Sequence, residues 1–98
     1  MADAGAGGRT FNDAQDDFMR AHHDMLVDPR NDVEALDRAG CGPRVTDLAR
    51  LAIAVSAEGQ SAEGWRTWIS ESLGPECRPR LEEAEACMRV SGLWPWAT

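Results

Sequence analysis

Lysine and tyrosine are absent from this 98-residue chain, and all ten of its basic residues are arginine. The lack of lysine excludes Schiff-base and general-base chemistry that depends on a lysine amine. A GC-rich genome would explain the lack, since Ala, Gly, Arg and Pro are plentiful. Selection against lysine modification or lysine-directed degradation is the less favoured alternative, and composition alone does not separate the two.

Large aliphatic side chains are scarce, because Leu, Ile, Val and Phe together make up only 16 of the 98 residues. This share lies below the level of roughly 20% at which disorder becomes an alternative for a highly charged chain. Four Trp residues offset the shortage, since each can bury about 150–250 Å². We therefore predict one folded domain of low stability, on the order of 3–6 kcal/mol.

Positive charge is also in short supply, with 17 acidic residues against 10 basic ones and a net charge of −7. Nucleic-acid binders and proteins of anionic membrane surfaces normally need a basic patch, so we expect neither kind of partner. No apolar run approaches the roughly 20 residues that span a bilayer. The first residues lack the basic and apolar regions of a secretory signal. These observations favour a cytoplasmic location.

The three cysteines, Cys41, Cys77 and Cys87, are odd in number and include no Cys-x-x-Cys pair. This pattern argues against a disulfide framework and against a closed zinc site. We expect structural thiols, with Cys41 the most exposed of them because glycines flank it.

Apolar residues recur at helical spacing along most of the chain, and no convincing strand is found. The sequence predicts an all-α domain, a small bundle of four to five short helices with a disordered N-terminal tail. The predicted parts are a disordered tail at 1–9, a helical domain at 10–92 with helices near 10–26, 30–39, 43–57, 61–73 and 79–90, and a Trp-Pro-Trp tail at 93–98. The segment 43–57 is the most hydrophobic, so we place it at the centre.

Each of the last three predicted helices has a distinct apolar stripe. The stripes are Val45, Leu48, Leu51, Ala52 and Val55 in the central helix; Trp65, Trp68, Ile69 and Leu73 in the next; and Leu81, Ala84 and Met88 in the last. Ser61 is a good N-cap for the second of these helices. We expect no continuous helix through Cys77, because the Arg78-Pro79 step disfavours it, and we start the last helix near Pro79.

The first predicted helix has an apolar face and a strongly acidic face. Thr10 and Asp13 have the spacing of a capping pair. The apolar set is Phe11, Ala14, Phe18, Ala21 and Met25, and the acidic set is Asp13, Asp16, Asp17 and Asp24. These four aspartates are our first candidate surface for a basic protein partner, since complementary charge speeds encounter. A merely solvated face is the alternative.

No catalytic, cofactor or metal motif is found. His22, His23 and Asp24 are ordinary metal-ligand types, but neither histidine has a carboxylate, Cys or His three or four positions away. We expect His22 to flank the core and His23 to be solvated, and we predict no metal, no cofactor and no enzymatic activity.

Trp94-Pro95-Trp96 is the most unusual local feature. Our preferred interpretation is that the indoles cap a core short of large side chains, with Trp94 more buried than Trp96. A second interpretation makes Trp94 and Trp96 a terminal motif that inserts into a partner, because exposed Trp is common at binding hot spots. A third makes the segment the product of a ribosomally made precursor peptide carried on a helical leader.

The composition and the lack of motifs favour a non-catalytic acidic protein that binds another protein, such as an inhibitor, an immunity protein or an antitoxin with a basic partner. The precursor peptide is the alternative. The oligomeric state is left open.

Overall fold

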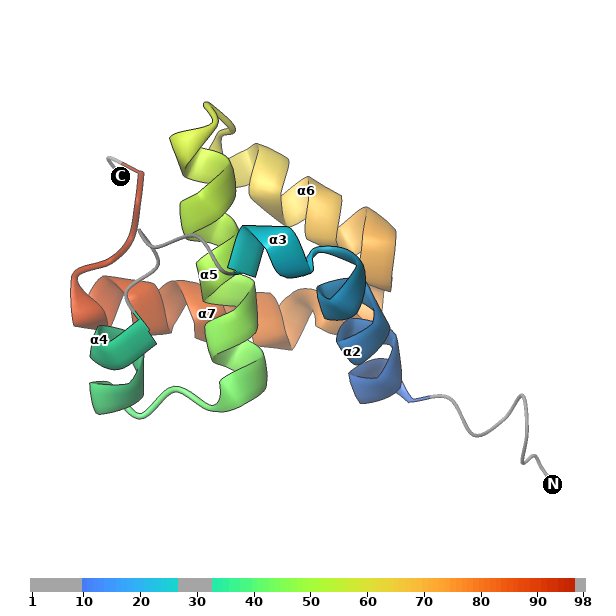
Figure 1. Cartoon of the computed structure of the whole chain (residues 1–98), viewed down its shortest axis with the longest axis horizontal. Helices are drawn as coiled ribbons and strands as arrows, with labels where there is room; N and C mark the ends of the chain where they lie inside the picture. Colours follow the sequence, from blue (N-terminus) through green and yellow to red (C-terminus); the bar gives the residue numbers. More distant parts are fainter. Residues whose placement is uncertain (1–9, 27–32, 97–98) are drawn as a thin grey trace, which may run out of the picture.

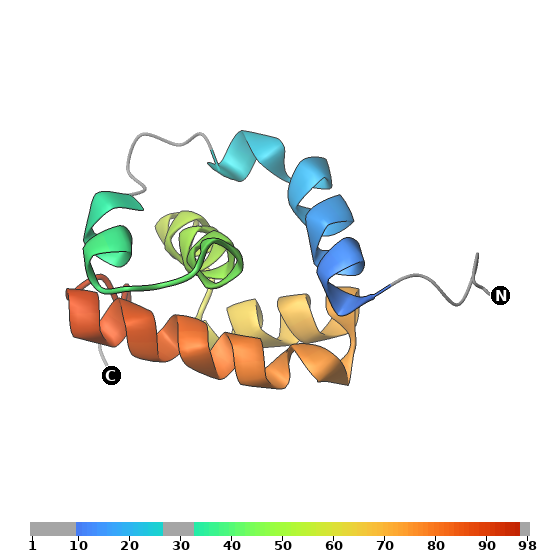
Figure 2. The same ribbon diagram turned by 90° about the horizontal axis from the view of Figure 1, so that it is seen from below.

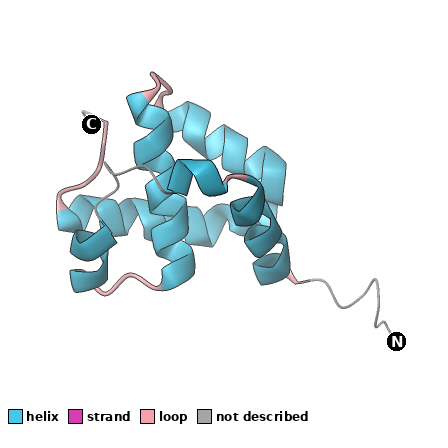
Figure 3. Ribbon diagram, in the orientation of Figure 1, coloured by secondary structure: helices cyan, strands magenta, loops and turns pink. Residues whose placement is uncertain are grey.

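A computed structural model describes residues 10–26 and 33–96, and all regular structure in these two ranges is helical (Figure 3). The elements are α2 (Phe11–Ala21), α3 (His23–Leu26), α4 (Val33–Arg38), α5 (Pro43–Ala57), α6 (Ala62–Leu73), the 3-10 helix η1 (Pro75–Cys77) and α7 (Arg78–Ser91). The all-α prediction is confirmed. The predicted tail at 1–9, the predicted helix start at residue 30 and the end of the tail at 97–98 lie outside the described residues.

The central helix is α5, as the hydrophobic pattern predicts. It contacts α3, α4, α6 and α7, and Figure 2 shows it almost end-on with the other helices around it. Leu48, Leu51 and Ala52 are fully buried. The long helix α7 crosses α5 (Figure 1) and buries Leu81, Ala84 and Met88 as predicted. Burial of these two stripes forms half of the core, and Trp65 and Ile69 of α6 are fully buried beside them.

The prediction of one continuous helix through residues 10–26 is wrong, because α2 ends at Ala21 and α3 begins at His23. In a regular helix the backbone N–H of His22 would bond to the carbonyl of Phe18. Here the ring Nδ1 of His22 lies 2.8 Å from that carbonyl oxygen, and the backbone N–H donates to Met19 instead. A side chain that competes for a helical carbonyl interrupts the helix.

The buried face of α2 is also rotated from the predicted one. Ala21 is exposed, whereas Gln15 and Met19 are buried. A buried glutamine is costly unless its amide is hydrogen-bonded, and Gln15 has such partners. Its Nε2 donates to the carbonyl of Arg44 (2.9 Å), and its Oε1 accepts from Arg80 (2.8 Å). The predicted N-terminal capping box of Thr10 and Asp13 is confirmed.

The chain turns sharply between α6 and α7. Ser61 caps α6 as predicted, through a 3.0 Å bond from the N–H of Gly64, and Gly74 ends the helix with a φ of +88° that glycine adopts readily. The last helix starts close to the predicted position: Cys77 ends the 3-10 helix η1, and the α-helix α7 begins at Arg78, one residue before Pro79. Pro79 lies in the first turn of α7, where a backbone N–H has no helical partner to lose.

Cys41 and Cys87 form a disulfide with a Cα–Cα distance of 6.2 Å, within the usual range of 4.4–6.8 Å. The expectation of three structural thiols is therefore wrong for this pair. The expectation that Cys41 is the most exposed cysteine is also wrong, since it is only 8% exposed and Cys87 is half-buried. The expectation of a structural thiol holds for Cys77, which is free and buried. Spacing could not reveal the pair, because the cysteines are 46 residues apart and meet only through the packing of α4 and α5 on α7.

Candidate functional site

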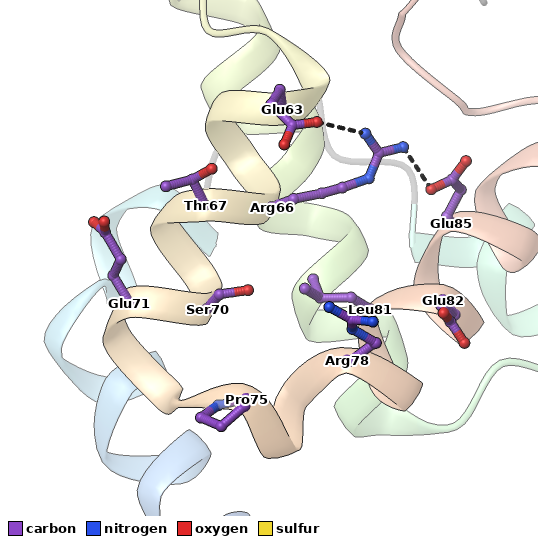
Figure 4. A pocket seen from close by; sticks show the side chains of 10 residues that line it. All are labelled: Glu63, Arg66, Thr67, Ser70, Glu71, Pro75, Arg78, Leu81, Glu82 and Glu85. Atoms are coloured by element: carbon purple, nitrogen blue, oxygen red, sulfur yellow. Dashed lines mark hydrogen bonds and ion pairs between the residues drawn. The ribbon is translucent and has the colours of Figure 1, made fainter.

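Helices α6 and α7 diverge from the η1 corner and border a groove of about 830 Å³ (Figure 4). Its size is typical of pockets that take a ligand. The lining residues are Glu63, Arg66, Thr67, Ser70, Glu71, Pro75, Arg78, Leu81, Glu82 and Glu85. The sequence did not predict this site. The groove depends on the angle between α6 and α7, and the turn at Gly74 sets that angle.

An arginine bridge crosses the groove at one end, with Pro75 at the other (Figure 4). Arg66 of α6 donates from Nη2 to Glu85 Oε1 of α7 at 2.7 Å, and its Nη1 lies 3.5 Å from Glu63 Oε1. Glu85 also accepts from Arg89 at 3.0 Å. Burial alone would raise the pKa of Glu85, but the hydrogen bonds and charges of Arg66 and Arg89 outweigh it and hold the pKa below its ordinary value.

Two carboxylates of the groove have no such neutralisation. Glu71 and Glu82 are exposed and make no ion pair with any residue in the described ranges. Between the helices, Pro75 and the buried Leu81 supply apolar lining. The lining as a whole carries four carboxylates and two guanidiniums. The groove can therefore accept a ligand that combines positive charge with apolar surface.

The four aspartates predicted as a binding face have different positions. Asp13 belongs to the capping box of α2. Asp16 pairs with Arg44 of α5 at 3.0 Å, and Asp17 pairs with Arg20 one turn along α2. Asp24 is exposed on α3. Three of the four thus have intramolecular partners, and a role of this face in partner binding stays a prediction.

The pKa of Asp47, whose carboxyl group lies near Asp16, is shifted in the opposite direction to that of Glu85. Partial burial raises the pKa of Asp47 on α5, the nearby charge of Arg50 lowers it, and the charge of Asp16 raises it further. The balance is a raised pKa, so the fold disfavours the ionised form of this group.

Arg80 of α7 joins the N-terminal helix to the rest of the domain, a role that sequence reasoning missed. Its Nη1 donates to Asn12 Oδ1 and to Gln15 Oε1, both at 2.8 Å, and its guanidinium lies 4.8 Å from the centre of the Phe11 ring. The four-residue spacing of Phe11, Gln15 and Met19 is the signal that could have placed the glutamine on the inner face.

Trp94 and Trp96 pack on the domain. The Trp94 and Trp96 rings lie 6.2 and 5.9 Å from the buried ring of Trp65, and 5.0 Å from each other. Trp96 Nε1 donates to the carbonyl of Gln60 at 2.8 Å. The guanidinium of Arg89 lies 4.4 Å from the Trp94 ring. The indoles are both half-buried, which leaves part of each surface open to a partner.

The histidine pair lies away from the groove. His22 is half-buried, with its ring 4.3 Å from Phe18 and 5.2 Å from Trp68, whereas His23 is exposed, as expected for both. Within residues 10–26 and 33–96, no three His, Cys, Asp or Glu side chains are grouped so that they could hold a metal ion. Over the same ranges, no helix has the length and apolarity needed to cross a bilayer.

Comparisons with protein-family models, with curated proteins and with solved structures give no match for this chain.

Proposed function

We propose that this is a non-catalytic, cytoplasmic protein that binds a basic segment of another protein in the groove between α6 and α7. The observation that carries the proposal is the pair of exposed carboxylates, Glu71 and Glu82, which make no ion pair in the described ranges and line the groove together with Pro75, Leu81 and a single further guanidinium on α7, that of Arg78. An inhibitor, an immunity protein or an antitoxin with a basic partner would belong to this class.

Electrostatic attraction favours a basic partner both at long range and at direct contact. The net charge of −7 attracts a cationic segment over a distance of about one Debye length, and such attraction speeds encounter more than it adds affinity. At contact, Lys or Arg side chains of the segment would pair with Glu71 and Glu82. These pairs form without breaking an existing ion pair in the described part of the chain.

The groove is a better candidate than the aspartate face of α2 because it offers a concave surface as well as charge. A ligand that enters a concave site loses more water contact than one on a convex helix face, so each contact is stronger. The ion pairs that Asp16 and Asp17 already form also reduce the negative charge that this face presents to a partner. A segment with aliphatic side chains next to its cations fits the groove lining.

The precursor-peptide alternative is less well supported, because the described part of the C-terminal segment packs against Trp65 and α7 through Trp94 and Trp96. A cleavable product segment needs to reach a processing enzyme. Mass spectrometry of the protein from its native host distinguishes the two: a segment that is cut off, or cross-linked at Trp, would favour the precursor.

The test uses a labelled amphipathic helical peptide with Arg on one face and Leu on the other, and a counterpart with Glu in place of Arg. Fluorescence anisotropy measures the binding of both to the full chain. We expect only the basic peptide to bind, with an affinity that falls as ionic strength rises. Reversal of charge in Glu71→Arg/Glu82→Arg should weaken binding by about tenfold or more.

Two double variants serve as matched controls, since each also changes the net charge from −7 to −3. Asp37→Arg/Glu58→Arg changes exposed residues outside the groove lining, and Asp17→Arg/Asp24→Arg changes the aspartate face. Both should weaken binding much less than the groove variant. Equal weakening by all three would mean that only net charge matters, and the strongest effect from the aspartate variant would place the site on α2 and α3; either result contradicts the proposal.

A further inference from the structure

The Cys41–Cys87 disulfide fastens the turn between α4 and α5 to the C-terminal half of α7. It is the covalent link between the segment that carries α4 and the α7 side of the core. Cys77, the other cysteine, is fully buried, with its Sγ 3.6 Å from Ser70 Oγ. The bonded pair and the free thiol are therefore in different surroundings.

The disulfide borders a hollow of about 250 Å³ at the surface. Its lining is built almost wholly of small or apolar residues: Ala39, Gly40, Cys41, Gly42, Val45, Glu83, Ala86, Cys87 and Val90. A Cβ atom added at Gly40 or Gly42 would meet nothing within 4 Å, and Cys87 is only half-buried. Cys87 is therefore the more accessible partner of the disulfide for an attacking thiol, since Cys41 is buried.

Besides the disulfide, helix α4 is held on α5 and α7 by packing that includes the fully buried Leu36. It has six residues, and isolated helices shorter than about 12–15 residues are marginal in water. Among its side chains from Glu34 to Arg38, only Leu36 is buried. Helices α5, α6 and α7, in contrast, each bury at least two side chains completely. Helix α5 packs directly on α6 and α7, so these three helices stay in contact without the disulfide.

We propose that the Cys41–Cys87 pair is a thiol–disulfide exchange site, at which a small or protein dithiol reduces the bond and releases α4 from α7 while the α5–α6–α7 core stays folded. The attacking thiolate forms a mixed disulfide with one cysteine and expels the other as a thiolate, which takes up a proton. The second thiol of the reductant then resolves the mixed disulfide. Two electrons and two protons pass from the dithiol to the pair, and the reductant leaves as a disulfide.

This site couples the fold to the redox state of its surroundings. Disulfides persist in oxidising compartments and are reduced or transient in the cytosol. In a reducing cytosol the form with α4 released would be the resident one, and oxidation would lock α4 onto α7. The inference does not depend on the proposed groove ligand, because the hollow and the groove share no lining residue.

The first test counts reactive thiols in the native chain by alkylation with iodoacetamide and mass spectrometry. After oxidation we expect no labelled cysteine, since two are bonded and Cys77 is buried. After treatment with dithiothreitol, without denaturant, we expect two labels, on Cys41 and Cys87. The variant Cys77→Ser should give the same result, because Cys77 takes no part in the exchange.

The second test measures amide hydrogen exchange before and after reduction. We expect exchange in α4 to accelerate by about tenfold or more, as in local opening, while exchange in α5 changes little. The double variant Cys41→Ser/Cys87→Ser should behave as the reduced chain without any reductant. A bond that resists dithiothreitol until the chain is denatured, labelling of Cys77 together with the other two, or unchanged exchange in α4 would each overturn the proposal.

Discussion

At the scale of single residues, Glu85 ties two arginines to the C-terminal segment, because its two carboxylate oxygens hold Arg66 and Arg89 against the Trp94 ring. The variant Glu85→Gln removes the charge from both hydrogen bonds. We expect it to lower the stability at neutral pH by about 1 kcal/mol, since the arginines are partly exposed and solvent screens the pairs. Thermal melting monitored by circular dichroism measures the loss.

The pH dependence of that difference gives a second test of the same contacts. The pKa of Glu85 in the folded chain lies below its ordinary value of 4.5, so the carboxylate stabilises the fold above that pH. The stabilisation is lost as the pH falls through the folded-state pKa. The gap in melting temperature between the original chain and Glu85→Gln should therefore shrink as the pH drops below 4.5; a constant gap would mean that the charge is irrelevant.

Gln15 is the residue whose loss should be felt most among the polar side chains, because it is fully buried and bonded at both ends of its amide. The variant Gln15→Leu leaves the carbonyl of Arg44 and one N–H of Arg80 without this partner. We expect a loss of about 1–3 kcal/mol in chemical denaturation. Gln60→Leu, at an exposed side chain, is the control and should change stability little.

Among single residues, only roles that depend on local spacing could be predicted from the sequence. The capping pair of Thr10 and Asp13, and the Ser61 cap, need contacts only three residues apart. The burial of Gln15 depends on Arg80, which is 65 residues away along the chain. The helix break at His22 depends on a hydrogen bond between its ring and the carbonyl of Phe18. No rule of residue spacing predicts that the ring makes this bond instead of facing solvent.

At the scale of elements, the C-terminal segment behaves as part of the core. Leu93 and Trp94 both donate their backbone N–H groups to the carbonyl of Met88, and both tryptophans pack on Trp65. We expect deletion of residues 93–98 to lower the melting temperature by roughly 10 °C, which corresponds to about 2 kcal/mol in a domain of this size. Val90→Ala, at a 78% exposed side chain, is the control. An equal effect of both changes on the melting temperature would mean that the C-terminal segment does not stabilise the core.

The helices α5, α6 and α7 could be predicted because each has a regular apolar stripe and a proline, serine or glycine at its ends. Helix α7 begins at Arg78, within one residue of the predicted start at Pro79, whereas the 3-10 turn η1 before it was not predicted, because apolar periodicity does not mark a helix of three residues. The angle between α6 and α7, and with it the groove, follows from tertiary packing that periodicity does not encode.

At the scale of the whole molecule, the core depends on few large side chains. A single substitution that leaves a cavity in it should therefore lower the free energy of unfolding strongly. Leu51 is fully buried in α5, and Leu51→Ala should cost about 2–5 kcal/mol, close to the predicted total stability. Denaturation in urea should show a largely unfolded variant, most clearly in the reduced chain. A variant as stable as the original would contradict the placement of α5 at the centre.

The central claim is that a basic segment docks between α6 and α7, and the most direct measurement is a nuclear magnetic resonance titration of the isotope-labelled chain with the Arg–Leu peptide. Backbone amide shifts locate a bound ligand without any mutation. The largest shifts should fall on groove residues such as Thr67, Glu71 and Glu82. Shifts that concentrate on Asp17 and Asp24, or that are as large for the Glu-substituted peptide, would contradict it.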